Sequence, residues 1–502
     1  MNNKILYLPL DDRPCVYDFT LKTAKNAGFD LIVPDKKILG SFLTQGNYFK
    51  IRDWLKQNIK KTHTALIYAD SFVFTNLISS RSYLIDVKET IKRFNELKEI
   101  LNTSNAVIYL YSILLRQAPT GYDDISVADA EKIVRISNEI SKDISPEMLL
   151  DPEWFKNIFV KDFSDKHDIS ESLITRYLMT RFRNLSLNLR IMELVRDRKC
   201  YRLFIGTDDI KTKSINYAEA ELIKKLIGKM SFSRRVTLYN GTDEGGQLML
   251  AGAISRIKDL KPCFKLFYFP DWCKNTVTSY ENLKVSKNIK LMVESCGGRI
   301  VKDNKSADII LLINGPLGFQ YESESQDESI ILYKNYYSEI YRLIAENKKL
   351  NKITALIDIA YSNGSDISLI DFLEKSTQLS FLDIYSAWNT SGNSIAGAIS
   401  QSISLLINGK NRSLNIELTA ERFLDDHIYQ SRIRKMIRKK LLLEKISPYN
   451  LKNNRKKTEN IIRKMMSSVS ENFLKKNFPK LNKKIFFRLP WKRIFEIGIE
   501  IK

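Results

Sequence analysis

The sequence predicts an α/β protein in which parallel strands are joined by crossover helices. Ten short runs rich in Ile, Leu, Val, Tyr and Phe have the composition and length of buried strands. Amphipathic segments of helical period lie between most of these runs, which indicates βαβ units and parallel pairing. Two arrangements fit this alternation, namely two doubly wound lobes or one distorted (β/α) barrel, and we favour the two lobes.

The predicted strands are residues 4–9, 30–33, 65–69, 105–110, 202–206, 235–239, 264–269, 308–313, 353–358 and 381–386. The predicted helices are residues 87–101, 125–142, 167–198, 214–228, 245–257, 281–296, 327–348 and 393–407. A last strand is expected from Arg493 to Ile501. Residues 111–200 depart from the alternation because they are mostly helical, so we expect an insertion or cap there.

A chain of 502 residues is long enough for two or three domains. We expect an N-terminal α/β domain over residues 1–260, with the helical insertion at about 111–200. A second α/β lobe is expected over residues 261–420. Residues 421–502 are expected to form a basic, mainly helical C-terminal region.

The composition is that of an ordinary soluble globular protein, with 44% hydrophobic and 27% charged residues. No apolar run has membrane-spanning length, and the first residues lack the order of a signal peptide, so a cytoplasmic location is expected. The five cysteines and three histidines are scattered, which argues against a disulfide framework, a zinc site or histidine-based chemistry. Carboxylates are the reactive groups that remain, and no cofactor is expected, with Mg²⁺ or Mn²⁺ as the alternative.

The positive charge is concentrated at the C-terminal end of the chain. The whole chain has a net charge of +22. Residues 431–502 hold 22 Lys and Arg against 5 Asp and Glu, a net charge of +17. Such a segment can bind nucleic acid, anionic lipid or an acidic partner, or can be a solvated helical surface. We favour the solvated surface and keep nucleic-acid binding as an alternative.

Four predicted strands run into acidic residues. The carboxyl ends of parallel strands are where α/β proteins bind ligands. Two adjacent carboxylates raise one another's pKa, so one can stay protonated near neutral pH, as glycosidases require. The alternative is that the acidic residues cap the helices that follow. The predicted catalytic residues are Asp208, Asp209, Asp11 and Asp12.

Further polar and aromatic residues near strand ends are candidates for substrate binding. Arg13 could clamp an anionic group, and the indole of Trp388 could stack on a sugar ring beside polar amides. Simple turns and helix caps are the alternatives, with Asn393 or Ser394 as the cap of the helix at 393–407. The predicted binding residues are Arg13, Asp70, Arg81, Asp243, Glu244, Asp358, Asn363, Trp388, Asn389 and Asn393.

A third acidic group lies nearer the C-terminal end of the chain. Arg422, Asp425 and Asp426 fall on a predicted helix, where a solvated face is the usual environment for charged residues. The glycines of the stretch Asn240–Gly246 could allow the backbone to approach a ligand, but the spacing is not that of a phosphate-binding loop.

Five motifs, in this order along the chain, resemble a bacterial family of unknown function, domain-of-unknown-function family 4127. They are Leu8-Pro9-Leu10-Asp11-Asp12-Arg13-Pro14, the stretch Asn76–Arg81, Gly206-Thr207-Asp208-Asp209, Ala360-Tyr361-Ser362-Asn363-Gly364 and Ala387-Trp388-Asn389-Thr390-Ser391-Gly392-Asn393. The resemblance covers nearly the whole chain and implies which positions matter, but no activity. The chain departs from the family at Phe72–Asn76, where the family is richer in glycine.

A narrower set of residues is similar to hexosaminidases that act on O-linked N-acetylglucosamine. The match is limited to Asp208, Asp209, Trp388 and Asn389. This similarity implies that Asp208 orients the acetamido group of the substrate and that Asp209 is the general acid.

The sequence thus predicts a carbohydrate-active hydrolase that uses paired carboxylates on a small-molecule sugar. The alternatives are a Mg²⁺- or Mn²⁺-dependent hydrolase or phosphotransferase and a non-catalytic sugar-binding protein. In the metal-dependent alternative, Asp11, Asp70, Asp208 and Asp243 would hold the ion.

Overall fold

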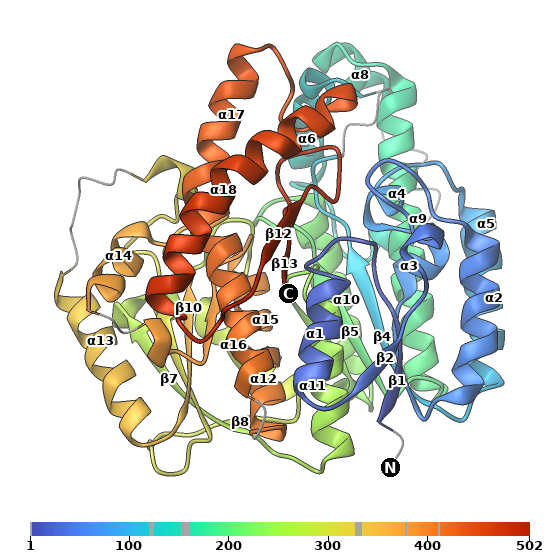
Figure 1. Ribbon diagram of the computed structural model, residues 1–502. Coiled ribbons are helices and arrows are strands. Elements are labelled where there is room, and N and C mark those ends of the chain that lie inside the picture. The colour runs from blue at the N-terminus through green and yellow to red at the C-terminus, as the bar shows by residue number, and fades with distance from the viewer. Residues whose placement is uncertain are drawn as a thin grey trace. The chain divides into compact units, whose positions relative to one another are not determined.

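The chain folds into two compact units, each built on a parallel sheet with helices around it (Figure 1). The structure is a computed structural model. It describes residues 3–119, 125–151, 154, 160–326, 334–376, 379–409 and 412–502. Unit 1 consists of residues 1–12, 31–249 and 280–282. Unit 2 consists of residues 13–30, 250–279 and 283–502.

The sheet of unit 1 has six strands in the order β2-β1-β3-β4-β5-β6. The pairs β1–β3, β3–β4, β4–β5 and β5–β6 are all parallel. The strands are β1 (Lys4–Leu8), β2 (Asp30–Ile32), β3 (Thr64–Tyr68), β4 (Val107–Leu114), β5 (Arg202–Thr207) and β6 (Val236–Asn240). The helices are α2 (Tyr48–Asn58), α3 (Ala69–Phe74), α4 (Leu77–Ser80), α5 (Val87–Asn102), α6 (Val127–Ile140), α8 (Val160–His167), α9 (Glu171–Arg196) and α10 (Ile215–Lys229). Helix α11 (Gly245–Ile257) begins in unit 1 and ends in unit 2.

The sheet of unit 2 has five parallel strands in the order β11-β10-β9-β7-β8. The strands are β7 (Cys263–Phe269), β8 (Arg299–Ile300), β9 (Ile309–Asn314), β10 (Ile353–Asp358) and β11 (Ile384–Ser386). A separate antiparallel pair is formed by β12 (Ile485–Arg488) and β13 (Gly498–Ile501). The helices are α1 (Asp18–Asn26), α12 (Val285–Ser295), α13 (Lys334–Lys349), α14 (Ile367–Lys375), α15 (Ser391–Ile407), α16 (Arg412–Arg422), α17 (Arg434–Leu443) and α18 (Arg455–Asn477). A π-helix, Phe423–Ile433, joins α16 to α17.

The two sheets have the same winding. Numbered along the chain within each unit, the first five strands of unit 1 stand in the order 2-1-3-4-5, and so do the five strands of unit 2. This is the doubly wound order of flavodoxin-type sheets, in which ligands bind where the strand order reverses. The prediction of two doubly wound lobes, rather than one barrel, and of a helical C-terminal region is confirmed.

Capping side chains explain where several helices of unit 1 begin. The carboxylate of Asp86 accepts a hydrogen bond from the backbone N–H of Glu89 at 2.7 Å and starts α5. The hydroxyl of Ser170 does the same for Leu173 at the start of α9. The predicted helix 167–198 is interrupted just before this cap, since Asp168 has a φ of 49°.

The structure differs from the predicted elements in three further places. Strand β4 runs to Leu114 because Tyr111–Leu114 pair with Phe204–Thr207. The predicted last strand is shorter than expected and corresponds to β13. Its partner β12 was not predicted, because each strand of this antiparallel pair is only four residues long. The predicted helix 327–348 is α13, and residues 327–333 lie outside the described residues.

The glycines of the 240–246 segment are required by tyrosine packing. The buried rings of Tyr7, Tyr68 and Tyr111 lie under the start of α11, where the Tyr68 hydroxyl accepts a hydrogen bond from the N–H of Gly246 at 2.7 Å. A Cβ at Gly245 would lie 2.0 Å from Cε2 of Tyr111, and one at Gly246 would lie 2.1 Å from the Tyr7 hydroxyl. Close packing against protein therefore accounts for these glycines without a ligand.

We expect Gly245→Ala to lower the free energy of unfolding by about 1–3 kcal/mol, because the new methyl group overlaps the Tyr111 ring. Gly228→Ala is the matched control, since Gly228 lies in α10 with nothing within 4 Å of its would-be Cβ, and it should stabilise by about 0.5–1 kcal/mol. Urea unfolding of both variants checks this. Equal effects would show that the Tyr111 ring can move aside.

Candidate functional site

The carboxyl edge of the unit 1 sheet gathers most of the predicted acidic residues. Because the strands are parallel, the segments after β1, β3, β5 and β6 leave from the same edge. These segments carry Asp11, Asp12, Asp70, Asp208, Asp209, Asp243 and Glu244. The strand order reverses between β1 and β3, so Asp11, Asp12 and Asp70 follow the strands of the switch point. Asp208, Asp209, Asp243 and Glu244 follow β5 and β6, at the other end of the sheet.

Asp208 is bound by Arg81 at the end of β5. The Arg81 guanidinium donates to Oδ2 of Asp208 from Nε at 2.9 Å and from Nη2 at 2.5 Å. The Asp208 side chain is 7% exposed and the Arg81 side chain 10% exposed. The two donors of the guanidinium hold this carboxylate oxygen in a fixed position. Two residues predicted from separate motifs are therefore in direct contact.

Asp209 has a different environment from its neighbour. Its side chain is 35% exposed, and its nearest cation is Nη1 of Arg116, 3.6 Å from Oδ2. Loss of hydration and then the charge of Asp208 raise the pKa of Asp209 to about 6, against the opposing effect of Arg116 and Arg81. Asp209 adopts a φ of 39°, and its carbonyl accepts a hydrogen bond from Nδ2 of Asn216 at 3.2 Å. This backbone conformation places the carboxylates of two successive residues in different environments.

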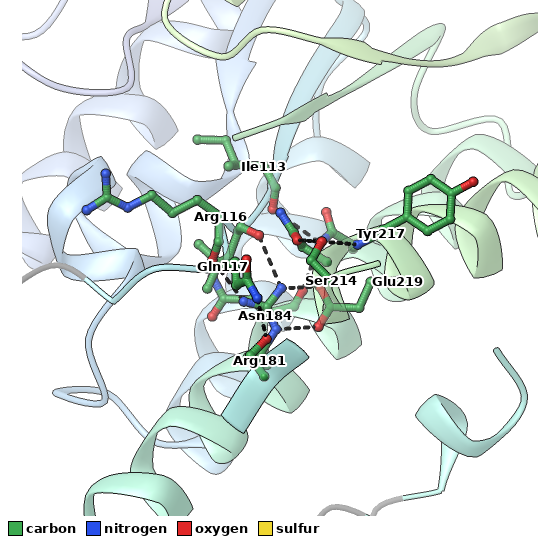
Figure 2. A network of polar contacts seen from close by, with 12 residues as sticks. Ile113, Arg116, Gln117, Arg181, Asn184, Ser214, Tyr217 and Glu219 are labelled. Carbon is green, nitrogen blue, oxygen red and sulfur yellow. Dashed lines mark hydrogen bonds and ion pairs between the residues drawn. The ribbon is translucent and has the colours of Figure 1, made fainter. Parts of the chain in front are cut away.

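Arg116 was not predicted, and a buried ion pair fixes the backbone that carries it. Figure 2 shows the Arg181 guanidinium beside the carboxylate of Glu219, with Nε donating to Oε1 at 2.7 Å. Arg181 also donates to the backbone oxygens of Leu115 at 3.1 Å and Arg116 at 2.9 Å. Both side chains of the pair are no more than 2% exposed. The pair thus fixes the carboxyl end of β4, next to Asp209.

Asp243 adds a third carboxylate to this electrostatic neighbourhood. Its negative charge contributes to the raised pKa of Asp209. Asp243 is 5% exposed and Glu244 is 2% exposed. The Tyr68 hydroxyl lies 3.3 Å from the backbone oxygen of Asp243, which ties this turn to the tyrosine cluster. The structure therefore brings Asp208, Asp209 and Asp243 together with two arginines.

The segment after β1 divides between the two units. Asp11 is fully buried and Asp12 is partly buried, both in unit 1. Arg13 belongs to unit 2, where its guanidinium is 3.7 Å from the carboxylate of Glu496 and lies over the Trp491 ring. These contacts give Arg13 a structural partner, and its role as an anion clamp stays a prediction.

Asp70 is buried in the first turn of α3. It is 1% exposed, Oδ2 accepts from the N–H of Ile113 at 3.0 Å, and Oδ1 has no hydrogen-bond partner among the described residues. Burial raises the pKa of Asp70 to about 7. Arg183, also fully buried, opposes this rise through its charge, and burial lowers its own pKa to about 9. The carboxyl of Asp70 is thus poised to take up a proton on folding.

Because the folded pKa of Asp70 is raised, the folded state binds its proton more tightly than the unfolded chain. The resulting stability is present below about pH 4 and is lost as the pH rises toward about 7, by up to about 4 kcal/mol. Asp70→Asn should make the free energy of unfolding depend less on pH between about pH 4 and about pH 7. The control Asp271→Asn, which changes an exposed carboxylate, should leave this dependence unchanged. Urea unfolding at pH 5 and pH 8 measures the difference, and an unchanged slope in Asp70→Asn would contradict the assignment.

In unit 2, Asp358 has a structural set of contacts at the end of β10. Its carboxylate accepts from Nδ2 of Asn314 at 2.9 Å and from the N–H of Asp366 at 2.8 Å. Asp366 in turn caps α14 through the N–H of Leu369. Burial, followed by the nearby charge of Asp366, raises the pKa of Asp358 to about 7. Asp358 is fully buried, so these contacts explain it without a substrate.

Asn363 and Asn389 form a turn pair. Both have positive φ values, 59° and 60°, and the N–H of Asn363 donates to the backbone oxygen of Asn389 at 2.8 Å. The Asn363 amide also donates to Oε2 of Glu322 at 2.6 Å. The turn at Asn363 and Gly364 that the sequence indicated is present, since Gly364 has a φ of 148°.

Trp388 is not an exposed stacking surface. It is 2% exposed, and its ring lies 6.0 Å from that of Phe495 at a tilted angle. The following helix begins at Ser391, with Thr390 at the N-cap, so the expectation that Asn393 or Ser394 caps it is wrong. Ser394 donates to the backbone oxygen of Trp388 at 3.0 Å instead, and Asn393 is buried within α15.

The expectation of a solvated face at Arg422, Asp425 and Asp426 is also wrong. The three residues are 6%, 5% and 0% exposed, and Arg422 donates to Oδ1 of Asp426 at 2.7 Å. They belong to a buried segment in which His427 Nδ1 lies 2.8 Å from the Ser365 hydroxyl. The sequence does indicate burial here, because apolar residues on more than one side of this helix flank the acidic ones. The apolar residues are Phe423, Leu424, Ile428 and Tyr429.

Two observations bear on metals and membranes. Among the described residues, no group of three or more His, Cys, Asp or Glu side chains is arranged to hold a metal ion. No helix within the described part of the chain combines the length and the apolar character needed to cross a bilayer.

The comparison with protein families decides the identity of the chain. The sequence profile of the family described as "Protein of unknown function (DUF4127)" matches residues 5–500. The chain belongs to family DUF4127. No curated protein and no solved structure gives a significant match. The similarity to hexosaminidases therefore has no support beyond the four residues that suggested it, whereas the resemblance to DUF4127 is confirmed.

Proposed function

We propose that this DUF4127 protein is an acid–base hydrolase whose reaction centre is the Asp208–Asp209 pair. The observation that carries the proposal is the difference between the two neighbours. Asp208 is paired with Arg81, whereas Asp209 is more exposed and has its pKa raised to about 6. A carboxyl group with its pKa raised to about 6 can act as the proton donor, and the neighbouring carboxyl group held by an arginine supplies the second carboxyl of the pair.

The roles follow from these environments. Asp209 donates a proton to the leaving-group oxygen as the C–O bond breaks, since a group with a pKa near 6 is partly protonated near neutral pH. Water then adds to the sugar carbon and gives up a proton, which restores the acid form of Asp209. Asp208, held in place by Arg81, is assigned the stabilisation of positive charge that develops on the substrate. Asp243 adds negative charge to the same neighbourhood and favours the protonated form of Asp209.

The substrate class proposed is a glycoside. Cleavage of a glycosidic bond passes through a state with positive charge on the sugar, which needs one carboxylic acid and one carboxylate. The proposal does not use Trp388 as a stacking surface, because the indole is buried. We assign to Arg116, which has a side chain that is 24% exposed and lies 3.6 Å from Asp209, the contact with a polar or acidic group of the sugar.

The experiment is a panel of chromogenic neutral, N-acetylated and acidic glycosides, tested at pH 5 to 8. We expect turnover of at least one substrate by the wild type and by the control Asp271→Asn, in which an exposed carboxylate is neutralised. Asp209→Asn should be inactive on that substrate. Equal turnover by the wild type and Asp209→Asn would remove Asp209 from the mechanism.

A further inference from the structure

Helix α17 and the segment after it present an exposed surface that combines lysines with large apolar side chains. Figure 1 draws the ribbon of α17 in orange-red, and the exposed residues of this region are here called the α17 surface. It consists of Lys435, Met436, Lys439, Lys440, Leu442, Leu443, Lys445 and Tyr449, all exposed. Glu444, within this segment, pairs with Lys457 of α18 at 2.8 Å.

The apolar part of this surface is large for a solvated helix. Met436 is 58% exposed, Leu442 57%, Leu443 77% and Tyr449 65%. Met436, Lys440 and Leu443 are spaced by four and then three residues and so share one helix face. The adjoining face of α17 is buried through Ile437 and Leu441. Solvation explains the lysines but not the exposed leucines, which indicate an interaction site.

The charges identify the kind of partner. Residues 431–502 have a net charge of +17. The neighbouring arginines are engaged by acidic side chains of the same unit, since Arg432 pairs with Asp371 and both Arg434 and Arg438 pair with Glu324. Lysines therefore provide most of the exposed positive charge, next to leucines rather than stacking aromatics. Nucleic-acid surfaces use arginine and aromatic contacts more heavily than this surface does.

We propose that the α17 surface docks on the face of a lipid bilayer that carries anionic headgroups. The lysines are attracted to the headgroups, and the side chains of Met436, Leu442 and Leu443 enter the boundary between headgroups and acyl chains. The ring of Tyr449, with its polar hydroxyl, suits the same boundary. The helix lies on the bilayer and does not cross it. This inference is independent of the chemistry proposed at Asp209.

The test is sedimentation of the full chain with vesicles of phosphatidylcholine alone or with one-third phosphatidylglycerol. We expect binding to the anionic vesicles only, weakened by salt. The double variant Lys439→Gln/Lys440→Gln should bind about 25-fold more weakly, at about fivefold for each lysine. Leu442→Ser/Leu443→Ser should bind at least about tenfold more weakly.

The matched control is Lys287→Gln/Lys290→Gln, which removes two exposed lysines from α12. It should bind the anionic vesicles like the wild type, and circular dichroism should show that all variants are folded. If vesicle binding weakened equally in the control and in the α17 variants, net charge alone would explain the binding. That result would overturn the proposal. Retention of a DNA duplex without retention on anionic vesicles would also overturn it, in favour of nucleic acid.

Discussion

Asp209→Asn should lower kcat on a cleaved substrate by about 10²- to 10⁴-fold, the usual contribution of a positioned proton donor. The amide keeps the size of the side chain and cannot donate the proton. In the wild type, activity should fall as the pH rises through about 6, because Asp209 then loses the proton that it must give. The measurement is kcat against pH from 4 to 9 for the wild type, Asp209→Asn and the control Asp271→Asn.

The charges around Asp209 predict the direction of two further shifts in this pH profile. Asp208 raises the pKa of Asp209, so Asp208→Asn should move the alkaline limb to lower pH. Arg116 lowers the pKa of Asp209, so Arg116→Met should move the same limb to higher pH. Opposite movements are specific to an electrostatic role, because misfolding would lower the activity of both variants without a directed shift. If the alkaline limb moved in the same direction in the two variants, the titrating group would not be Asp209.

The fold was predictable from the chain because its signals are local. Short β-branched and aromatic runs gave nearly every strand, and α11 was predicted with the bounds that it has, Gly245–Ile257. The strand order within each sheet was not predictable, because it depends on contacts between residues far apart in sequence. The repeated 2-1-3-4-5 winding is visible only once those pairings are known.

The candidate site was predictable in part. The acidic residues at strand ends were found because they follow apolar runs directly, and the contact between Arg81 and Asp208 links two predicted residues. Arg116 was missed because the end of β4 was placed four residues too early. Trp388 was predicted to bind substrate from its residue type, its place at a strand end and the neighbouring amides, and none of these distinguishes a buried indole from an exposed one.

The buried partner of this site gives the largest expected change in stability. Arg181→Met would leave the carboxylate of Glu219 buried without its cation, which typically costs about 3–5 kcal/mol of unfolding free energy. Burial already raises the pKa of Glu219, and Arg181 is the residue that opposes the rise. Without Arg181, the pKa of Glu219 should therefore rise further, and the destabilisation should be greater at pH 8 than at pH 5.

The double variant Arg181→Met/Glu219→Gln separates stability from function. It removes both charges, so urea unfolding should show recovery of much of the lost stability. The backbone oxygens of Leu115 and Arg116 would still lack the guanidinium that donates to them in the wild type. Positioning of Arg116, and with it the pH profile of Asp209, should remain altered although the protein is stable. A double variant with the wild-type profile would show that the ion pair serves folding alone, and that β4 orients Arg116 without it.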